Sequence, residues 1–231
     1  MLLTTTYPEP VVSADCSVYR PQDDSRLLVD TMHHSGLMPG RRVLDLCTGS
    51  GFVAIAAAEM GCASVTAFDN CARAVRCSRA NAAVAGVAVD VREGSCSGAV
   101  DLAPFDVVVS NPPYVPTPPG GDTDAICSNA GPSWAWNAGP DGRLVLDPLC
   151  EAVPKLLSDG GSLLLVHSAL AGVRKSLDSL IWAGMRAEVV ASKLIPFGPV
   201  LSARARWLEG TGRIPRGRRE EELVVIRADK R

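Results

Sequence analysis

Two patterns of hydrophobic and polar positions alternate along most of this chain. Short apolar runs predict buried strands, and longer stretches with apolar residues three or four positions apart predict helices. The apolar runs predict seven strands, at residues 42–47, 64–70, 87–94, 105–114, 161–167, 186–192 and 221–228. The helical stretches cover residues 23–37, 51–61, 71–86, 142–161 and 171–185.

The alternation of strands and helices predicts an α/β fold. A β-α-β order implies a Rossmann-like, mostly parallel seven-stranded sheet with helices on both faces. Because no clear helical pattern separates the last two strands, we expect the last strand to run antiparallel. Residues 23–231 are expected to form a single domain after an irregular, Thr- and Pro-rich arm at residues 1–22.

Residues 193–220 form a long Pro-, Gly- and Arg-rich insert between the last two predicted strands. This insert is far longer than an ordinary connection. It could be a solvated loop, or a lid or docking arm for an acidic partner or RNA. Its basic residues are Arg204, Arg206, Arg213, Arg216, Arg218 and Arg219.

Composition narrows the function classes. The chain has 231 residues, of which 47% are hydrophobic, so it can bury a sizeable core. Its 23 basic and 25 acidic residues leave a net charge of −2, which gives no global attraction to nucleic acid. Aromatic residues make up only 5%, which disfavours a base-stacking surface.

The cysteines and the apolar segments bear on compartment and metal binding. The cysteines, at positions 16, 47, 62, 71, 77, 96, 127 and 150, form no CxxC pair, and the three histidines form no cluster with them. We therefore expect no metal site, and we expect reduced thiols in a cytoplasmic protein. No segment predicts a membrane span or a signal peptide.

A glycine turn follows the first predicted strand in VLDLCTGSG (43–51). Gly49 and Gly51 let the backbone approach a ligand, but they do not give the G-x-G-x-x-G spacing of dinucleotide-binding proteins. Asp69 ends the second strand, at a position where a carboxylate can accept hydrogen bonds from a ribose diol. Such a turn is also ordinary in α/β folds, and Asp69 and Asn70 could simply cap the next helix.

Asp45 lies inside the first apolar strand, where an unpaired acid would be costly. A structural partner could satisfy this carboxylate. The amino group of a ligand in the crevice beyond the strand could do the same.

The tetrapeptide Asn-Pro-Pro-Tyr at 111–114 closes the fourth predicted strand, after its apolar run FDVVV, and the two prolines stop that strand. Ligands of parallel sheets bind beyond the carboxyl ends of the strands, so these residues should meet the glycine turn in one crevice. The side-chain oxygen of Asn111 and the carbonyl of Pro112 can together accept both hydrogens of an NH2 group. Tyr114 can stack on a planar amide or base.

An amide nitrogen is a poor nucleophile because its lone pair is delocalised. Two acceptors on its hydrogens favour a pyramidal nitrogen, after which transfer needs mainly positioning and electrostatics. A rigid Pro-Pro turn without catalytic meaning is the alternative in isolation. The glycine turn and Asp69, expected at the same edge of the sheet as this tetrapeptide, favour the catalytic interpretation.

These motifs resemble the HemK-like N5-glutamine methyltransferases, a family of class I S-adenosylmethionine-dependent enzymes, and within it the short branch without an N-terminal helical domain. The resemblance runs from about residue 18 to residue 192. Four segments carry it: VYRPQDDSRLLVD (18–30), VLDLCTGSG (43–51), VVSNPPYVPTPP (108–119) and WNAGPDGRLVLDPLC (136–150).

The resemblance implies a role for each matching position. Asn111 and Pro112 would bind the target nitrogen, with Tyr114 shaping the slot. The S-adenosylmethionine site would comprise Ser25, Asp45, Cys47, Gly49, Gly51, Asp69, Asn70, Ser95 and Asn111.

Two residues depart from the family pattern. Cys47 stands where the loop usually has its first glycine, so the backbone approach is tighter there. Ser95 replaces an acid that often faces the adenine amino group, and Glu93 could substitute for it.

The resemblance implies a protein substrate, with the glutamine of the GGQ loop in translation release factors as the best-known case, and a small zinc-binding activator in eukaryotes. Adenine-N6 methylation of nucleic acid is an alternative, because NPPY is shared with such enzymes, but the acidic balance and the missing target-recognition domain oppose it. Small-molecule N-methylation and a non-catalytic, cofactor-binding scaffold subunit stay open as well.

Overall fold

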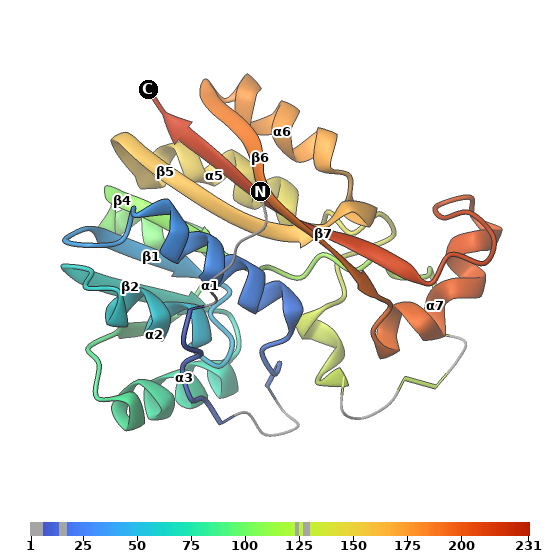
Figure 1. The fold of residues 1–231 in the computed structure, drawn as a ribbon, viewed down its shortest axis with the longest axis horizontal. Helices are drawn as coiled ribbons and strands as arrows, with labels where there is room; N and C mark the ends of the chain where they lie inside the picture. Colours follow the sequence, from blue (N-terminus) through green and yellow to red (C-terminus); the bar gives the residue numbers. More distant parts are fainter. Residues whose placement is uncertain (1–6, 14–17, 123–124, 127–129) are drawn as a thin grey trace.

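The computed structural model describes residues 7–13, 18–122, 125–126 and 130–231. Its centre is a seven-stranded sheet with the order β3-β2-β1-β4-β5-β7-β6 (Figure 1). The strands are β1 (Arg42–Leu46), β2 (Ser64–Asp69), β3 (Asp90–Glu93), β4 (Phe105–Ser110), β5 (Leu157–Ser168), β6 (Met185–Pro196) and β7 (Glu220–Lys230).

Strand directions confirm the predicted Rossmann-like class. β1 pairs in parallel with β2 and β4, β2 with β3, and β4 with β5. β7 is inserted between β5 and β6 and runs antiparallel to both. The last strand is therefore the reversed one, as expected.

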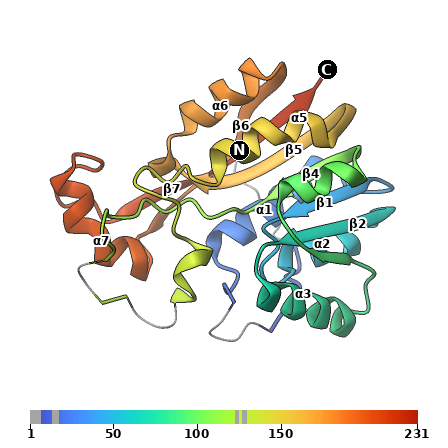
Figure 2. The same cartoon turned by 180° about the vertical axis from the view of Figure 1, so that it is seen from behind.

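Helices cover both faces of the sheet (Figures 1 and 2). α1 (Asp23–Ser35), α2 (Phe52–Glu59) and α3 (Ala72–Ala85) lie on one face. α5 (Leu146–Leu156) and α6 (Val173–Trp182) lie on the other, and the short α4 (Cys96–Ala99) contacts α5. Among the described residues, no helix combines the length and the apolar character needed to span a membrane.

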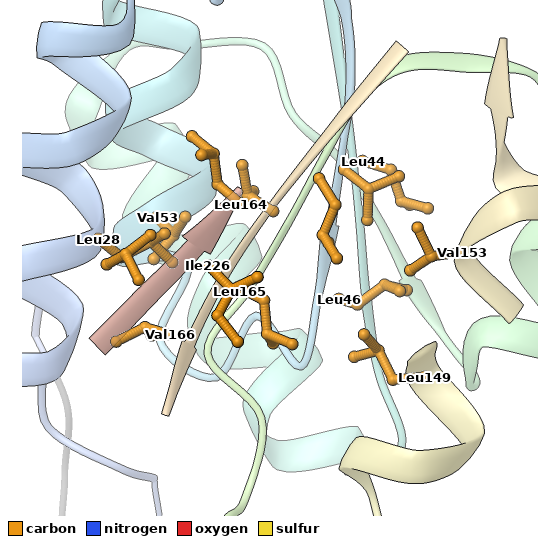
Figure 3. Packing of buried hydrophobic residues seen from close by; sticks show 14 of the residues in the cluster. Leu28, Leu44, Leu46, Val53, Leu149, Val153, Leu164, Leu165, Val166 and Ile226 are labelled. Carbon is orange, nitrogen blue, oxygen red and sulfur yellow. The ribbon is translucent and has the colours of Figure 1, made fainter. Parts of the chain in front are cut away.

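Alternating side chains explain why the core has two layers. Leu44 and Leu46 of β1 point toward Leu149 and Val153 of α5, while Leu28 of α1 lies on the opposite side of the sheet (Figure 3). All of them are almost fully buried. Burial of such aliphatic side chains contributes roughly 1.5–3 kcal/mol each.

Two segments differ from the sequence-based expectation. The helix predicted over residues 142–161 occupies only Leu146–Leu156, and β5 begins at once with Leu157. The pair Gly160 and Gly161, at the end of the predicted helix, instead lies inside β5, where a Cβ at Gly161 would come within 2.9 Å of the Ser158 carbonyl oxygen.

The segment 193–220 is not a loop throughout. β6 extends to Pro196, and α7 (Pro199–Gly210) follows, beginning with a proline at its first position, where no amide donor is needed. α7 lies beyond the ends of β6 and β7, away from the layers that cover the sheet (Figure 1). Its apolar residues Leu201, Ala205 and Leu208 are buried, and this spacing of four and then three residues is the helical signal that the proline- and arginine-rich composition obscured.

Candidate active site

A crevice opens at the carboxyl ends of β1, β2 and β4. Strand order changes direction between β1 and β4, and there Leu46 pairs with Ser110. The segments that follow these strands therefore meet, as expected for ligand sites in open α/β sheets. The main cavity has a volume of about 850 Å³, including its solvent-filled mouth.

Most of the predicted cofactor residues line this cavity. Its walls include Ser25 from α1, the turn from Cys47 to Ser50, Asp69 and Asn70 after β2, and Asn111 after β4. A second cavity of about 720 Å³ shares Cys47, Asp69 and Asn70 with the first and adds Ser95. The crevice thus has two lobes on either side of Asp69.

Asp69 is fixed by two backbone donors. Its Oδ2 atom accepts a hydrogen bond from the Gly49 amide at 2.9 Å, and its Oδ1 atom accepts one from the Cys71 amide at 2.9 Å. Burial raises the pKa of this carboxyl, and the two amide donors partly offset the increase. Each carboxylate oxygen keeps a further lone pair for a ligand hydroxyl.

The turn itself is left-handed at three positions. Cys47, Gly49 and Gly51 have φ angles of +62°, +55° and +86°. Of these three residues, only Cys47 is not a glycine. Its left-handed backbone conformation therefore costs about 1–2 kcal/mol. This is a physical reason for a glycine at that position in other chains.

The two glycines of the turn serve different purposes. A Cβ at Gly49 would meet no atom within 4 Å, so the space beside this residue is open to the cavity. A Cβ at Gly51 would lie 2.5 Å from the Ser78 hydroxyl oxygen, and Gly51 does not line the cavity. Gly51 therefore allows close packing of α2 on α3, not the ligand approach that the sequence suggested.

Asp45 lies behind the turn, with 1% of its surface exposed. Its Oδ2 atom accepts a hydrogen bond from the Thr48 hydroxyl at 2.6 Å, while its buried Oδ1 atom has no partner in the structure. Burial raises the pKa of Asp45 to about 7, and the Asp69 carboxylate adds to the increase. The structural partner considered in the sequence analysis is thus Thr48, and the Ala54 amide also acts to lower the pKa of Asp45.

Ser95 caps α4 rather than standing free. Its hydroxyl oxygen accepts a hydrogen bond from the Ser97 amide at 3.4 Å and shares another with the Ser97 hydroxyl at 2.7 Å. Ser95 still lines the second lobe of the crevice, together with Phe68. Glu93, the alternative contact, is exposed and does not line either lobe.

Asn111 lies at the boundary between the main cavity and a smaller one of about 260 Å³. We call the smaller one the catalytic corner; it is lined by Asn111, Pro112, Pro113, Tyr114, Asp24, Tyr19, Val115, Ala135 and Trp136. The Nδ2 atom of Asn111 donates a hydrogen bond to the Ser25 hydroxyl at 3.1 Å. Because the amide nitrogen is turned toward Ser25, the Oδ1 atom is the acceptor that remains for a ligand.

A buried carboxylate, Asp24, organises this corner, and the sequence analysis did not single it out. Its Oδ2 atom accepts hydrogen bonds from the hydroxyls of Tyr114 at 3.0 Å and Tyr19 at 3.1 Å. Its Oδ1 atom accepts from the amide and the hydroxyl of Ser25, at 2.6 and 3.3 Å. Asp24 is 4% exposed, and burial beside it raises the pKa of both tyrosines well above the usual range.

This network fixes the orientation of the Asn111 amide. A carboxylate can only accept, so the Ser25 hydroxyl donates to Asp24 and must itself accept from its other neighbour. Asn111 therefore presents its NH2 group to Ser25. The spacing in α1 contained the signal: Asp24 lies four residues before Leu28, on the buried face of the helix.

The loop after the catalytic corner is tied to α7 by one buried arginine. Arg204 donates to both carboxylate oxygens of Asp122, to the Pro116 carbonyl and to the Asn137 side chain. Its guanidinium also lies over the Trp136 ring, 4.7 Å from the ring centroid. Trp136 is buried against the corner, whereas Trp134 is partly exposed and lines the main cavity.

Other basic residues of the 193–220 segment also have local partners. Arg219 pairs with Glu209, Arg218 donates to the Glu220 carbonyl, and Arg213 lies over the Trp207 ring. Within the part of the chain that the structure describes, no group of three or more His, Cys, Asp or Glu residues could hold a metal ion.

Comparison with known proteins places this crevice in a family. The profile of the methyltransferase small domain matches residues 17–118. A provisionally named protein N5-glutamine methyltransferase of Methanocaldococcus jannaschii is 29% identical over 188 residues, which cover 81% of this chain and 91% of that protein. The release factor glutamine methyltransferase of Xylella fastidiosa (strain 9a5c) is 35% identical over 177 residues, 76% of this chain and 60% of the relative.

The chain is a methyltransferase, similar to the N5-glutamine methyltransferases. It spans nearly all of the archaeal relative but only 44% of the Deinococcus radiodurans release factor glutamine methyltransferase, to which it is 40% identical over 125 residues, 54% of this chain. This methyltransferase therefore matches the longer bacterial members over part of their length.

Solved structures share its fold. A chain of the E. cuniculi Mtq2–Trm112 complex, described as responsible for methylation of the eRF1 termination factor, superposes with a TM-score of 0.61 and 23% identity, covering 92% of this methyltransferase and 98% of that chain. The T. thermophilus 16S rRNA N2 methyltransferase RsmC, solved with AdoMet and guanosine, also gives a TM-score of 0.61, with 17% identity and coverage of 93% and 45%. At these identities the likeness concerns the fold alone.

Proposed function

We propose that this methyltransferase uses S-adenosylmethionine to methylate the side-chain amide nitrogen of a glutamine in a protein, with a translation release factor as the leading candidate acceptor. The observation that carries the proposal is the Asn111 amide, oriented by Ser25 and Asp24 so that its oxygen is left for a ligand. Similarity to N5-glutamine methyltransferases supports the reaction class.

The crevice suits the cofactor. S-adenosylmethionine, when bound, supplies an electrophilic methyl group on a sulfonium. Its positive sulfonium and ammonium groups would be favoured by the buried carboxylates Asp45 and Asp69, because nearby positive charge would offset the burial that raises the pKa of both. Asp69 would accept the ribose hydroxyls, and Ser25, Cys47, Gly49, Asn70 and Ser95 would complete the walls of the two lobes.

The catalytic corner would act on the acceptor. The Asn111 Oδ1 atom and the Pro112 carbonyl accept the two hydrogens of the target amide, which weakens conjugation of the nitrogen lone pair with its own carbonyl. The lone pair then forms the new N–C bond as the C–S bond breaks, and the nitrogen proton leaves to solvent afterwards. Tyr114, held by Asp24, shapes the wall of the slot.

The similarity to these relatives also suggests where the enzyme works. A release factor as substrate implies a cytoplasmic protein, and a small activator subunit of the Trm112 kind is the partner that the structural relative suggests. Arg204 of α7 is buried on Asp122, and Arg219, beyond α7, pairs with Glu209, so these two arginines offer little positive charge to RNA.

Isothermal titration with S-adenosylmethionine and with S-adenosylhomocysteine tests the cofactor assignment, and Asn111→Ala separates binding from transfer. Wild type and Asn111→Ala should bind both ligands, while transfer of a tritiated methyl group to protein should be lost only in the variant. Absence of binding by the wild type would overturn the cofactor assignment.

A further inference from the structure

A third cavity adjoins the catalytic corner. It has a volume of about 430 Å³, and its walls include Tyr19, Gln22, Tyr114, Trp136, Leu201 and Glu221. Tyr19, Tyr114 and Trp136 also line the catalytic corner. A side chain in the corner would therefore bring its flanking main chain close to this third cavity.

Two buried polar atoms on these walls lack partners. The Trp136 side chain is 6% exposed, and its Nε1 donor makes no hydrogen bond in the structure. The Glu221 side chain is 7% exposed, and its Oε2 acceptor also makes none. Leaving such a group unpaired costs about 1–3 kcal/mol, so each calls for an explanation.

The surroundings hold both side chains in place. The Arg204 guanidinium stacks on the Trp136 ring, and Glu221 belongs to β7, paired with Ile195 of β6. Burial raises the pKa of Glu221 to about 7, and the nearby Asp24 carboxylate adds to the increase, so this wall attracts hydrogen-bond donors.

We propose that this cavity binds a main-chain peptide group of the acceptor protein, beside the residue whose side chain enters the catalytic corner. The indole N–H of Trp136 donates to the peptide carbonyl, and the Glu221 carboxylate accepts from the peptide N–H. The inference rests on the proposed function in one respect, namely that the acceptor is a polypeptide.

The chemistry of the two atoms excludes simpler ligands. An indole nitrogen only donates, and Glu221 only accepts above about pH 7, where it is ionised. A cation would leave Trp136 unpaired, and an anion would face the Glu221 carboxylate. A peptide group carries both a donor and an acceptor, and a bridging water is the alternative that the experiment must distinguish.

The test uses a ligand that needs no methyl transfer. N-acetylglycine N-methylamide is titrated into the 15N-labelled protein, and the indole N–H signal of Trp136, assigned by its loss in Trp136→Phe, is followed by NMR. We expect a saturable downfield shift of this signal, while the signal of Trp182, which is 88% exposed, should change little. A Trp136 signal that does not respond, or that follows Trp182, would mean that water or nothing fills the cavity.

Two matched variants test whether Glu221 is the hydrogen-bond acceptor. Glu221→Leu should weaken binding of the probe about fivefold, as expected for the loss of one hydrogen bond. Glu222→Leu, next along β7 and not part of the cavity wall, should leave the binding curve unchanged. Equal curves for both variants would contradict the role of Glu221.

Kinetics with a protein acceptor provide the second readout. Trp136→Phe keeps an aromatic ring under Arg204 but removes the N–H, so KM for the acceptor should rise about fivefold with kcat within about twofold. An unchanged KM would overturn the proposal. Loss of methyl transfer in the wild type alone would contradict the proposed function and leave the NMR result standing.

Discussion

Replacement of Asp24 by asparagine tests the network that orients the catalytic amide. The carboxylate accepts four hydrogen bonds, from Tyr19, from Tyr114 and twice from Ser25. An asparagine keeps one acceptor oxygen and turns an NH2 group toward the other pair of donors. Two bonds to a charged group, each contributing about 1.5–3 kcal/mol, are then lost, and partial rearrangement should leave a loss of unfolding free energy of about 2–4 kcal/mol.

The catalytic effect follows from the same geometry. If the new NH2 group faces Ser25, the Ser25 hydroxyl no longer needs the Asn111 NH2 group as its donor, and the Asn111 amide is free to turn the wrong end toward the acceptor. We expect kcat to fall on the order of 10- to 100-fold, while the Kd for S-adenosylmethionine changes little, because Asp24 does not line the main cavity.

Steady-state kinetics measure kcat, and titration calorimetry measures the Kd for S-adenosylmethionine. Asp23→Asn is the control. Asp23 is the neighbouring acid in α1, and its pair with Lys193 is largely exposed, so its loss should cost at most about 1 kcal/mol and leave kcat unchanged. An Asp24→Asn variant with kcat within about twofold of wild type would refute the reasoning, as would an equal loss in Asp23→Asn.

Three further predictions concern separate parts of the molecule. Asp69→Ala should raise the Kd for S-adenosylmethionine at least tenfold in calorimetry, because the ribose hydroxyls lose their acceptor. Arg204→Lys should lower the unfolding free energy in urea by about 3 kcal/mol, because a buried two-bond pair with Asp122 is broken. Since burial raises the pKa of Asp45 from 3.8 to about 7, the folded state retains a proton that the unfolded state releases, so stability should fall as pH rises through this window. Asp45→Asn should flatten that fall, by up to about 1.4 kcal/mol per pH unit, in denaturation at pH 5 and pH 8.

The sheet and the crevice could be predicted because each depends on short-range patterns. Apolar runs marked the strands, and the NPPY corner followed directly from the end of β4. Asp69 followed in the same way from the end of β2, and the register of β2 against β1 brings it to the glycine turn. These positions are set by chain order and sheet topology alone.

Contacts between distant segments were the part that could not be predicted. The roles of Asp24 and Arg204 depend on partners 90 and 82 residues away in the chain, and α7 was hidden by its prolines and arginines. Gly51 shows the same limit. A side chain is excluded there because Ser78, on another helix, occupies the space.

The central claim is tested most directly by locating the transferred methyl group. A release factor is incubated with isotopically labelled S-adenosylmethionine and either the wild-type enzyme or Asn111→Ala, with and without a Trm112-type subunit, and the digested protein is sequenced by mass spectrometry. The account predicts one labelled methyl group on a glutamine side-chain amide with the wild type and none with the variant. A label on another residue type, or equal labelling by Asn111→Ala, would contradict it.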